Sequence, residues 1–170
     1  AVIAFSATLS PLPWLQTSLG MDERAVCSRA SSVFDSAQLR VCLATDIDTR
    51  YQKRADTLPA LAQLLRHWLG TTPGNCIVYF PSYHYLQDCL AQLHGTQSPP
   101  LSRTVWVQAR QQGDPEREQL LHLLAQREDV VAFCILGGVF GEGIDLPGKH
   151  LSSVVVVGTG MPQVNRDTRQ

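Results

Sequence analysis

Short apolar runs alternate with amphipathic stretches along most of the chain. Runs that are apolar or β-branched at most positions, or at every second position, predict strands. The predicted strands are Leu39 to Ala44, Asn75 to Phe80, Thr104 to Val107, Val130 to Leu136 and Val154 to Gly158. Leucines at helical spacing predict helices over Leu58 to Trp68, over Tyr83 to Leu93 and from Asp114-Pro115-Glu116, with Asp114 as the cap. This alternation predicts a parallel sheet covered by helices.

The N-terminal part is less regular. Ala1 to Phe5 is apolar and predicts a strand, and Pro13 to Met21 predicts a short helix. Residues 22–37 are polar and rich in serine, which predicts a loop with Phe34 as its anchor. The chain opens on the predicted strand without an initiator methionine, so we expect an excised piece of a longer protein.

Composition limits the function classes. The chain has 170 residues, 44% hydrophobic and 17% charged, with a net charge of −1, which is typical of about one globular domain. The chain is not basic overall, so its net charge does not indicate nucleic-acid binding. A local basic patch can still bind a phosphate backbone. No apolar run reaches the roughly 18 residues that cross a bilayer. We therefore expect a cytoplasmic protein with no membrane partner.

The cysteines and histidines show no ligand spacing. The five cysteines, Cys27, Cys42, Cys76, Cys89 and Cys134, include no C-x-x-C pair. This pattern favours reduced, mostly buried thiols and no metal site. We interpret the five histidines as structural or surface residues.

A glycine-rich loop with two acidic residues connects the last two predicted strands. It runs from Gly137 to Gly148 and contains Gly141, Glu142, Gly143 and Asp145. Glycines let a backbone approach a ligand closely, and open α/β sheets bind ligands at the carboxyl ends of their strands. The loop is therefore a candidate nucleotide or nucleic-acid site. The alternative is a tight connection whose acids are solvated.

The chain has no phosphate-binding loop of the form G-x-x-x-x-G-K-[ST] and no acidic strand end of the Walker B kind. We therefore expect that it does not bind a nucleoside triphosphate by itself in the usual P-loop way.

Three short motifs, in this order, resemble those of superfamily 2 DNA helicases of the DinG and XPD group, in the bacterial DinG-like form. Phe5 to Pro11 resembles motif III, with its "SATLSP", and Cys76 to Tyr83 resembles motif IV, an apolar strand ending in "F-x-S-Y". Gly137 to Pro147 resembles motif V, and Val155 to Asn165 resembles the strand and loop that follow it. The resemblance covers nearly the whole chain.

The resemblance implies a three-layer αβα RecA-like parallel sheet, truncated at both ends. Residues 1–21 would be the last strand of a first motor domain with its connector, and residues 22–170 the second RecA-like domain. Motif VI, Q-x-x-G-R-x-x-R, is missing, because Arg166 and Arg169 do not match its context.

The resemblance also implies an ATP-dependent DNA helicase as the parent protein. ATP and Mg²⁺ would lie between this domain and the first motor domain of the same chain, which brings the P-loop and the Walker B carboxylate. The iron–sulfur cluster that some members carry belongs to that first domain. This chain would bind no cofactor alone and would be inactive alone.

The motif positions give the site residues that the resemblance implies. Those of the ATP cleft and its coupling are Ser6, Thr8, Gly141, Glu142, Gly143 and Asp145. Those that bind single-stranded DNA are Ser82, Tyr83, Gln163 and Asn165. The alternatives are turn capping by Ser6 and Thr8, a Tyr83 that covers the core, and a solvated loop at Gln163 and Asn165. The competing function is a non-catalytic α/β module that binds a nucleotide or metabolite, or that regulates.

Overall fold

Four short apolar runs form one parallel sheet. The computed structural model describes residues 3–6, 10–22, 24–95, 101–137, 139–141 and 144–159. The strands are β1 (Cys76–Phe80), β2 (Thr104–Val107), β3 (Val130–Ile135) and β4 (Ser153–Val156). Their order is β2-β3-β1-β4, and every neighbouring pair is parallel. In the centre, Val78 of β1 lies opposite Phe133 of β3 on one side and Val155 of β4 on the other.

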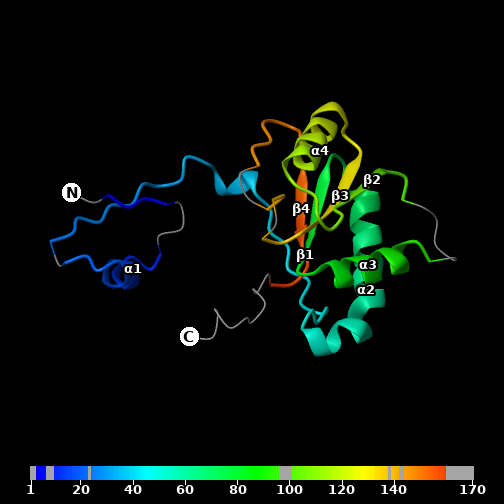
Figure 1. The fold of residues 1–170 in the computed structure, drawn as a ribbon, viewed down its shortest axis with the longest axis horizontal. Helices are drawn as coiled ribbons and strands as arrows, with labels where there is room; N and C mark the ends of the chain where they lie inside the picture. Colours follow the sequence, from blue (N-terminus) through cyan, green and yellow to red (C-terminus); the bar gives the residue numbers. More distant parts are fainter. Residues whose placement is uncertain are drawn as a thin grey trace. The chain divides into compact units, whose positions relative to one another are not determined.

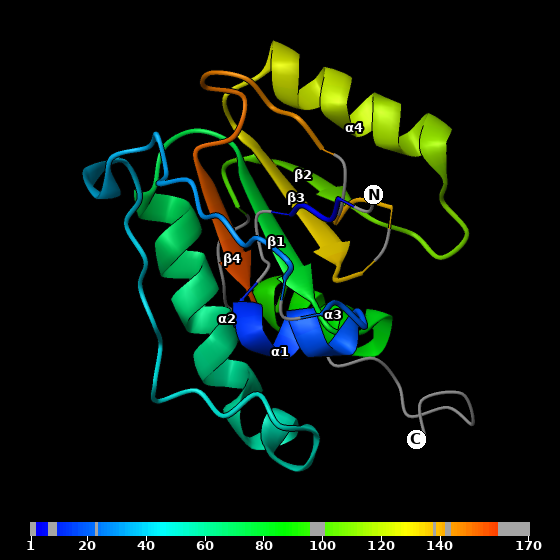
Figure 2. The same cartoon turned by 90° about the vertical axis from the view of Figure 1, so that its left-hand side faces the viewer.

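Helices cover both faces of this sheet, which gives three layers (Figures 1 and 2). The helices of this part are α2 (Arg54–Thr71), α3 (Tyr83–Leu93) and α4 (Asp114–Gln126), and α2 follows the 3-10 turn η2 (Tyr51–Lys53). The side chains of α2 and α3 share one core with alternate residues of β1, such as Val78 and Phe80. Those of α4 pack on the opposite face, against Ile77. The expected three-layer parallel α/β fold is confirmed.

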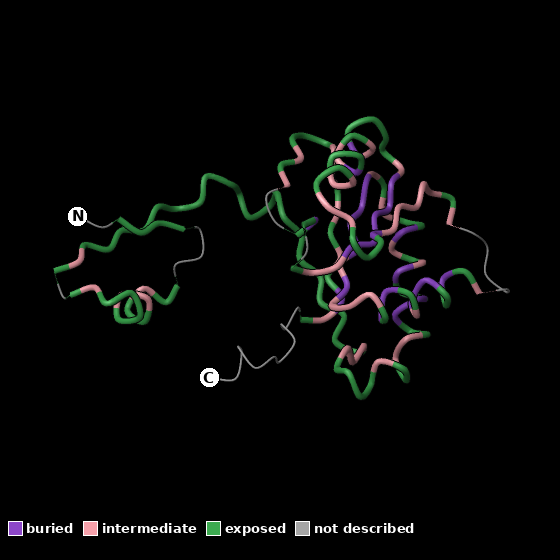
Figure 3. The backbone as a smooth tube through the Cα atoms, viewed as in Figure 1, coloured by how far each residue is buried: buried purple, intermediate pink, exposed green. Residues whose placement is uncertain are grey.

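The two central strands are buried on both faces. Every residue of β1 except Tyr79, and every residue of β3 except Ile135, is buried, and Figure 3 shows the buried residues gathered on the strands and on the helix faces toward them. Such strands read as continuous apolar runs instead of alternating ones. The edge strand β4 differs, since Val154 and Val156 remain about half exposed.

The predicted elements of this part mostly agree with the structure. The bounds of α3 and β2 are those predicted, and β1, β3 and β4 differ from their predictions by one or two residues. Helix α2 starts four residues before Leu58, because its first turn is polar and lies outside the apolar repeat. The predicted cap of α4 was wrong: Gly113 is the N-cap, and its N–H donates to the Glu116 carboxylate at 2.9 Å.

Residues 1–43 form a separate compact unit, and residues 44–170 form the other. The first unit contains α1 (Leu12–Ser18) and the 3-10 turn η1 (Ser36–Gln38). The strand predicted over Leu39 to Ala44 was wrong, because these residues have no ladder partner among the described residues and Leu39, Val41 and Leu43 are exposed. Residues 3–5 also carry no strand, and Phe34 is 76% exposed and anchors no core.

The thiols follow the same division between the two units. Cys76, Cys89 and Cys134 are buried in the sheet and α3, as expected, whereas Cys27 and Cys42 of the first unit are exposed. Burial raises the pKa of Cys89 and of Cys134 to about 12. The thiols of Cys89 and Cys134 therefore stay protonated at neutral pH, the form that is the poorer nucleophile.

Candidate functional site

The loops that could hold a ligand leave the carboxyl end of the sheet. Because all four strands are parallel, their carboxyl ends lie on the same side, which is the usual ligand side of such sheets. Ser82 follows β1, Gln108 follows β2, and the glycine-rich loop follows β3. Leu136 N–H donates to Phe80 O at 2.9 Å, so the ladder between β1 and β3 continues to the start of that loop.

Ser82 begins helix α3. Its backbone is extended, its side-chain oxygen accepts a hydrogen bond from Tyr85 N–H at 3.4 Å, and its carbonyl accepts from Leu86 N–H at 3.1 Å. These are the bonds of an N-cap serine, which explains a serine directly after an apolar strand. The cap fixes the direction in which α3 leaves the sheet and therefore fixes where its first residue, Tyr83, lies.

The Tyr83 hydroxyl is held by the loop that follows β2. It donates to Ala109 O at 3.1 Å and accepts from the Gln108 side-chain amide at 3.0 Å. The Arg110 guanidinium lies 5.6 Å from the centre of the Tyr83 ring, a cation–π distance. The interpretation of Tyr83 as a simple cover for the core is therefore incomplete, because this half-buried ring carries a cation beside it.

An open pocket of about 350 Å³ lies between the start of α3 and the loop after β2. Its lining residues are Tyr83, His84, Gln87, Gln108, Ala109 and Arg110. The lining therefore combines an aromatic ring, amide groups and a guanidinium. Such groups can stack on a base, bond its edge and attract a phosphate.

Gln108 and Arg110 were missed by the sequence prediction. The available signal was weak: a polar residue directly after the strand Thr104 to Val107, where the chain returns to the surface. Gln108 is nevertheless one of the two buried polar residues among those described. Arg110 lies in a tight turn, in which Gln111 takes a φ of 72° and the Gln112 side chain accepts from Ala109 N–H at 2.9 Å.

The glycine-rich loop is anchored by Phe140. The Phe140 side chain is fully buried, its ring centre lies 5.0 Å from that of Trp106, and its carbonyl accepts a hydrogen bond from the Tyr79 hydroxyl at 2.6 Å. Burial is the main cause that raises the pKa of Tyr79 to about 12, so this hydroxyl stays a donor. Gly137 takes a φ of +72°, which lets the chain turn out of β3.

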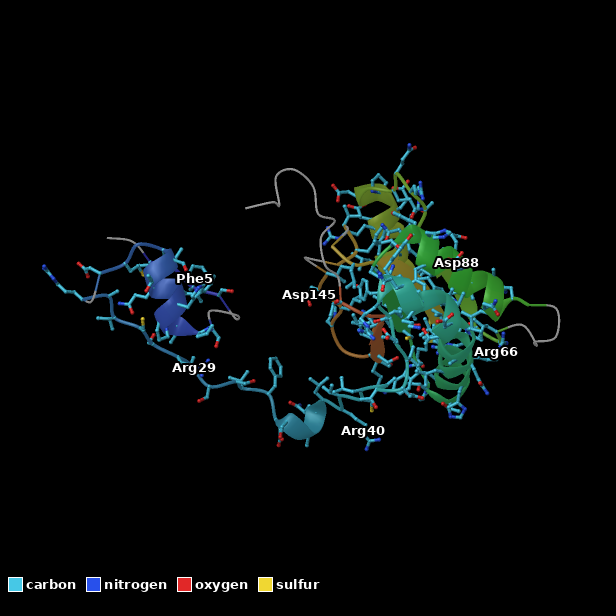
Figure 4. The ribbon with its side chains drawn as sticks, turned by 90° about the horizontal axis from the view of Figure 1, so that it is seen from below. Phe5, Arg29, Arg40, Arg66, Asp88 and Asp145 are labelled. Atoms are coloured by element: carbon cyan, nitrogen blue, oxygen red, sulfur yellow. The ribbon has the colours of Figure 1, made fainter. Side chains whose placement is uncertain are left out.

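Asp145 is exposed on the return part of this loop. Its neighbours Ile144 and Leu146 are half-buried and pack against the core that contains Phe140. The carboxylate therefore points outward from a backbone that is held on both sides. Figure 4 shows Asp145 on the opposite side of this unit from Arg66 of α2. Gly141 is exposed and directly follows Phe140.

The structure thus places Ser82 and Tyr83 at the start of α3, and Gly141 and Asp145 on one anchored loop. Ser6 is exposed in the first unit and lies outside its helices. Five predicted site residues lie outside the described residues: Thr8, Glu142, Gly143, Gln163 and Asn165.

Among the residues that the structure describes, no three His, Cys, Asp or Glu side chains are grouped closely enough to hold a metal ion. Within the described helices, none has both the length and the apolar character needed to span a membrane.

Comparison with known proteins places these features in a family. A family model described as the helicase C-terminal domain matches residues 65–170, more than half of the chain. These residues include the C-terminal part of α2 from Leu65, the whole sheet, the pocket and the glycine-rich loop.

Two curated relatives are DNA helicases by name. ATP-dependent DNA helicase CHL1 of Candida albicans is 29% identical over 129 residues, which is 69% of this chain and 15% of that protein. ATP-dependent DNA helicase chl-1 of Caenorhabditis elegans is 24% identical over 177 residues, which is 95% of this chain and 21% of that protein. The chain thus spans about a fifth or less of the length of these relatives.

A solved structure is also similar. It is described as the structure of S. tokodaii Xpd4, with 19% sequence identity and a TM-score of 0.49, and the match covers 72% of this chain and 21% of that one.

Proposed function

The chain belongs to the helicase C-terminal domain family, and from this membership we propose that it is the second motor domain of an ATP-dependent DNA helicase. In this proposal the domain forms one wall of an ATP cleft, against the first motor domain of the same protein, and it binds single-stranded DNA. The names of both curated relatives support the activity of the whole protein.

The observation that carries the DNA part of the proposal is the pocket beside Tyr83. A nucleobase has a π-face whatever its sequence, and its stacking on an aromatic ring contributes about 1–3 kcal/mol. Arg110, next to that ring, supplies a positive charge for the adjacent phosphate. Ser82 holds the start of α3, and Gln163 and Asn165 would extend the contact along the DNA backbone.

The nucleotide part of the proposal is supported by the anchored loop after β3. Its exposed residues Gly141 and Asp145 are held by the buried Phe140 and by the half-buried Ile144 and Leu146. We assign Gly141, Glu142, Gly143 and Asp145 to the ATP cleft, with Asp145 contacting ribose or an arginine of the first motor domain. Ser6 and Thr8 would couple the nucleotide state to movement of the domains.

We assign Mg²⁺ to the first motor domain, together with the P-loop and the Walker B carboxylate, because this sequence contains neither motif. Any iron–sulfur cluster of the whole protein would also lie in that domain. It follows that the 170 residues alone should not hydrolyse ATP, and Mg²⁺-dependent hydrolysis by the purified chain would contradict this assignment.

The experiment that tests the proposal is an ATPase assay on the full-length protein, with and without single-stranded DNA. We expect DNA to stimulate hydrolysis, and we expect Asp145→Ala to reduce the stimulated rate about tenfold or more, the loss of one charge-assisted hydrogen bond. Glu128→Ala is the matched control, since Glu128 is an exposed acid at the opposite edge of the sheet. A full-length protein without DNA-stimulated hydrolysis would instead favour the non-catalytic α/β module.

A further inference from the structure

Gln108 is a buried glutamine that is hydrogen-bonded to β3 and to the start of α3. It is 4% exposed and follows the last residue of β2. Its side-chain oxygen accepts a hydrogen bond from Ile135 N–H at 2.8 Å, at the end of β3. Its side-chain nitrogen donates to the Tyr83 hydroxyl at 3.0 Å, at the start of α3. Its backbone N–H donates to Phe133 O at 2.9 Å.

These bonds make the amide of Gln108 a rigid support. Two of them attach Gln108 to β3, a central strand that is itself held on both sides by the sheet. The bond from the Gln108 side-chain nitrogen holds the Tyr83 hydroxyl, which also donates to Ala109 O. A hydroxyl held at two points fixes where the far end of its ring lies, because rotation about the Cα–Cβ bond would break both bonds.

We propose that Gln108 is a positioning residue for DNA binding, which holds the Tyr83 ring ready to stack on a nucleobase. The proposal rests on the function proposed above for the pocket. A ring that is already oriented loses little side-chain freedom when a base binds, and this preorganisation raises affinity without any new contact. The Arg110 guanidinium lies over the same ring, 5.6 Å from its centre, so the ring that Gln108 supports also carries a cation.

The position of Ile135 adds a connection to the glycine-rich loop. Ile135 is the last residue of β3, and Gly137 opens that loop two residues later. One side chain therefore contacts both the strand that leads into the proposed ATP cleft and the residue proposed to contact DNA. Few side chains of this size could do so, because the task requires a donor and an acceptor on one planar group.

The test uses the full-length protein and a labelled oligodeoxythymidylate as the DNA probe. Gln108→Met keeps the size of the side chain but removes both hydrogen bonds, and Tyr83→Phe removes the hydroxyl alone. Each should raise the Kd for the probe about two- to tenfold, the usual net effect of one hydrogen bond. The double variant should bind the probe no more weakly than the weaker-binding single variant, because both changes remove the hydrogen bond between Gln108 and Tyr83.

Two further variants separate positioning from stability and from the proposed function. Asn75→Ala removes another buried amide, at the opposite edge of the sheet, and should lower stability without changing the Kd. Tyr83→Ala removes the stacking ring and should raise the Kd most.

The outcomes distinguish the two proposals even if Gln108→Met does not fold. An unchanged Kd in Tyr83→Ala would overturn the function of the pocket itself. A raised Kd in Tyr83→Ala with an unchanged Kd in Tyr83→Phe would overturn only the positioning role. Additive effects of Gln108→Met and Tyr83→Phe would show that Gln108 acts independently of the Tyr83 hydroxyl. An equal loss of affinity in Asn75→Ala would show that Gln108 acts through stability. Either result would also overturn the positioning role.

Discussion

The side-chain oxygen of Asn75 accepts a hydrogen bond from Val130 N–H at 2.9 Å, although the two residues are 55 positions apart. Asn75 is fully buried and precedes β1, and Val130 begins β3. The Asn75 side-chain nitrogen lies within hydrogen-bond distance of three carbonyl oxygens, those of Leu124, Arg127 and His150. One amide thus joins β1, β3, the end of α4 and the segment before β4 at the amino edge of the sheet.

We expect Asn75→Ala to reduce the free energy of unfolding by about 2–4 kcal/mol. The substitution leaves buried polar groups without partners, and each such group costs about 1–3 kcal/mol. Urea denaturation followed by circular dichroism would measure the change. The control is Gln126→Ala, which removes an exposed contact with His122 on α4 and should change stability by less than about 0.5 kcal/mol. A loss no larger than the control's would show that the carbonyls find other partners.

We expect Arg110→Ala to weaken binding of single-stranded DNA and to reduce its salt dependence. Each phosphate that a cation neutralises contributes about 0.7 to the slope of log K against log salt concentration for a single strand. The slope should therefore fall by about that amount, as measured by fluorescence anisotropy titrations at several salt concentrations. Arg127→Ala removes an exposed arginine that pairs with Asp129 at the amino edge and should leave the slope unchanged. Equal slopes in the Arg110 variant and the unaltered protein would place this residue outside the DNA contact.

The Asp48–Arg50 pair should contribute to stability at neutral pH and lose that contribution in acid. A side-chain hydrogen bond from Arg50 is the largest cause that lowers the pKa of Asp48, from 3.8 to about 2. A lowered pKa means that the folded state favours the ionised carboxylate. The stabilisation is therefore complete above about pH 4 and is lost as the pH falls toward about 2.

Substituting Asp48 tests this pH dependence. Denaturation of the Asp48→Asn variant should show a smaller decrease in stability over that pH interval than the unaltered protein. The matched control is Asp22→Asn, which removes another acid that lies near an arginine, in the N-terminal unit, and should leave the decrease unchanged. The same decrease in Asp48→Asn and in the unaltered protein would show that the pair also forms in the unfolded chain.

The sequence predicted elements best where burial and periodicity agree. Helix α3 was predicted with its observed bounds, because its leucines recur at helical spacing and five of its residues are buried. The error at Leu39 to Ala44 has the opposite cause. Alternation of Leu39, Val41 and Leu43 is a strand pattern, but a strand exists only with a partner, and the described residues provide none.

The candidate site was predicted in part for a related reason. Ser82 and Tyr83 belong to a recognisable motif, so their position after β1 could be predicted from the sequence. Gln108 belongs to no motif, and its role depends on the strand order, which places the end of β2 beside β3 and the start of α3. Residues 83, 108 and 135 are distant in the chain, so only the folded structure shows that they contact one another through Gln108.

The strand order β2-β3-β1-β4 also affects how the protein is made. During translation β1 leaves the ribosome before either of its neighbours, and β3 follows only about 50 residues later. Until then α2 and α3 can cover one face of β1, through Val78 and Phe80. Ile77 on the other face stays uncovered until α4 is made. During this interval the uncovered apolar face of β1 is open to chaperone binding and to aggregation.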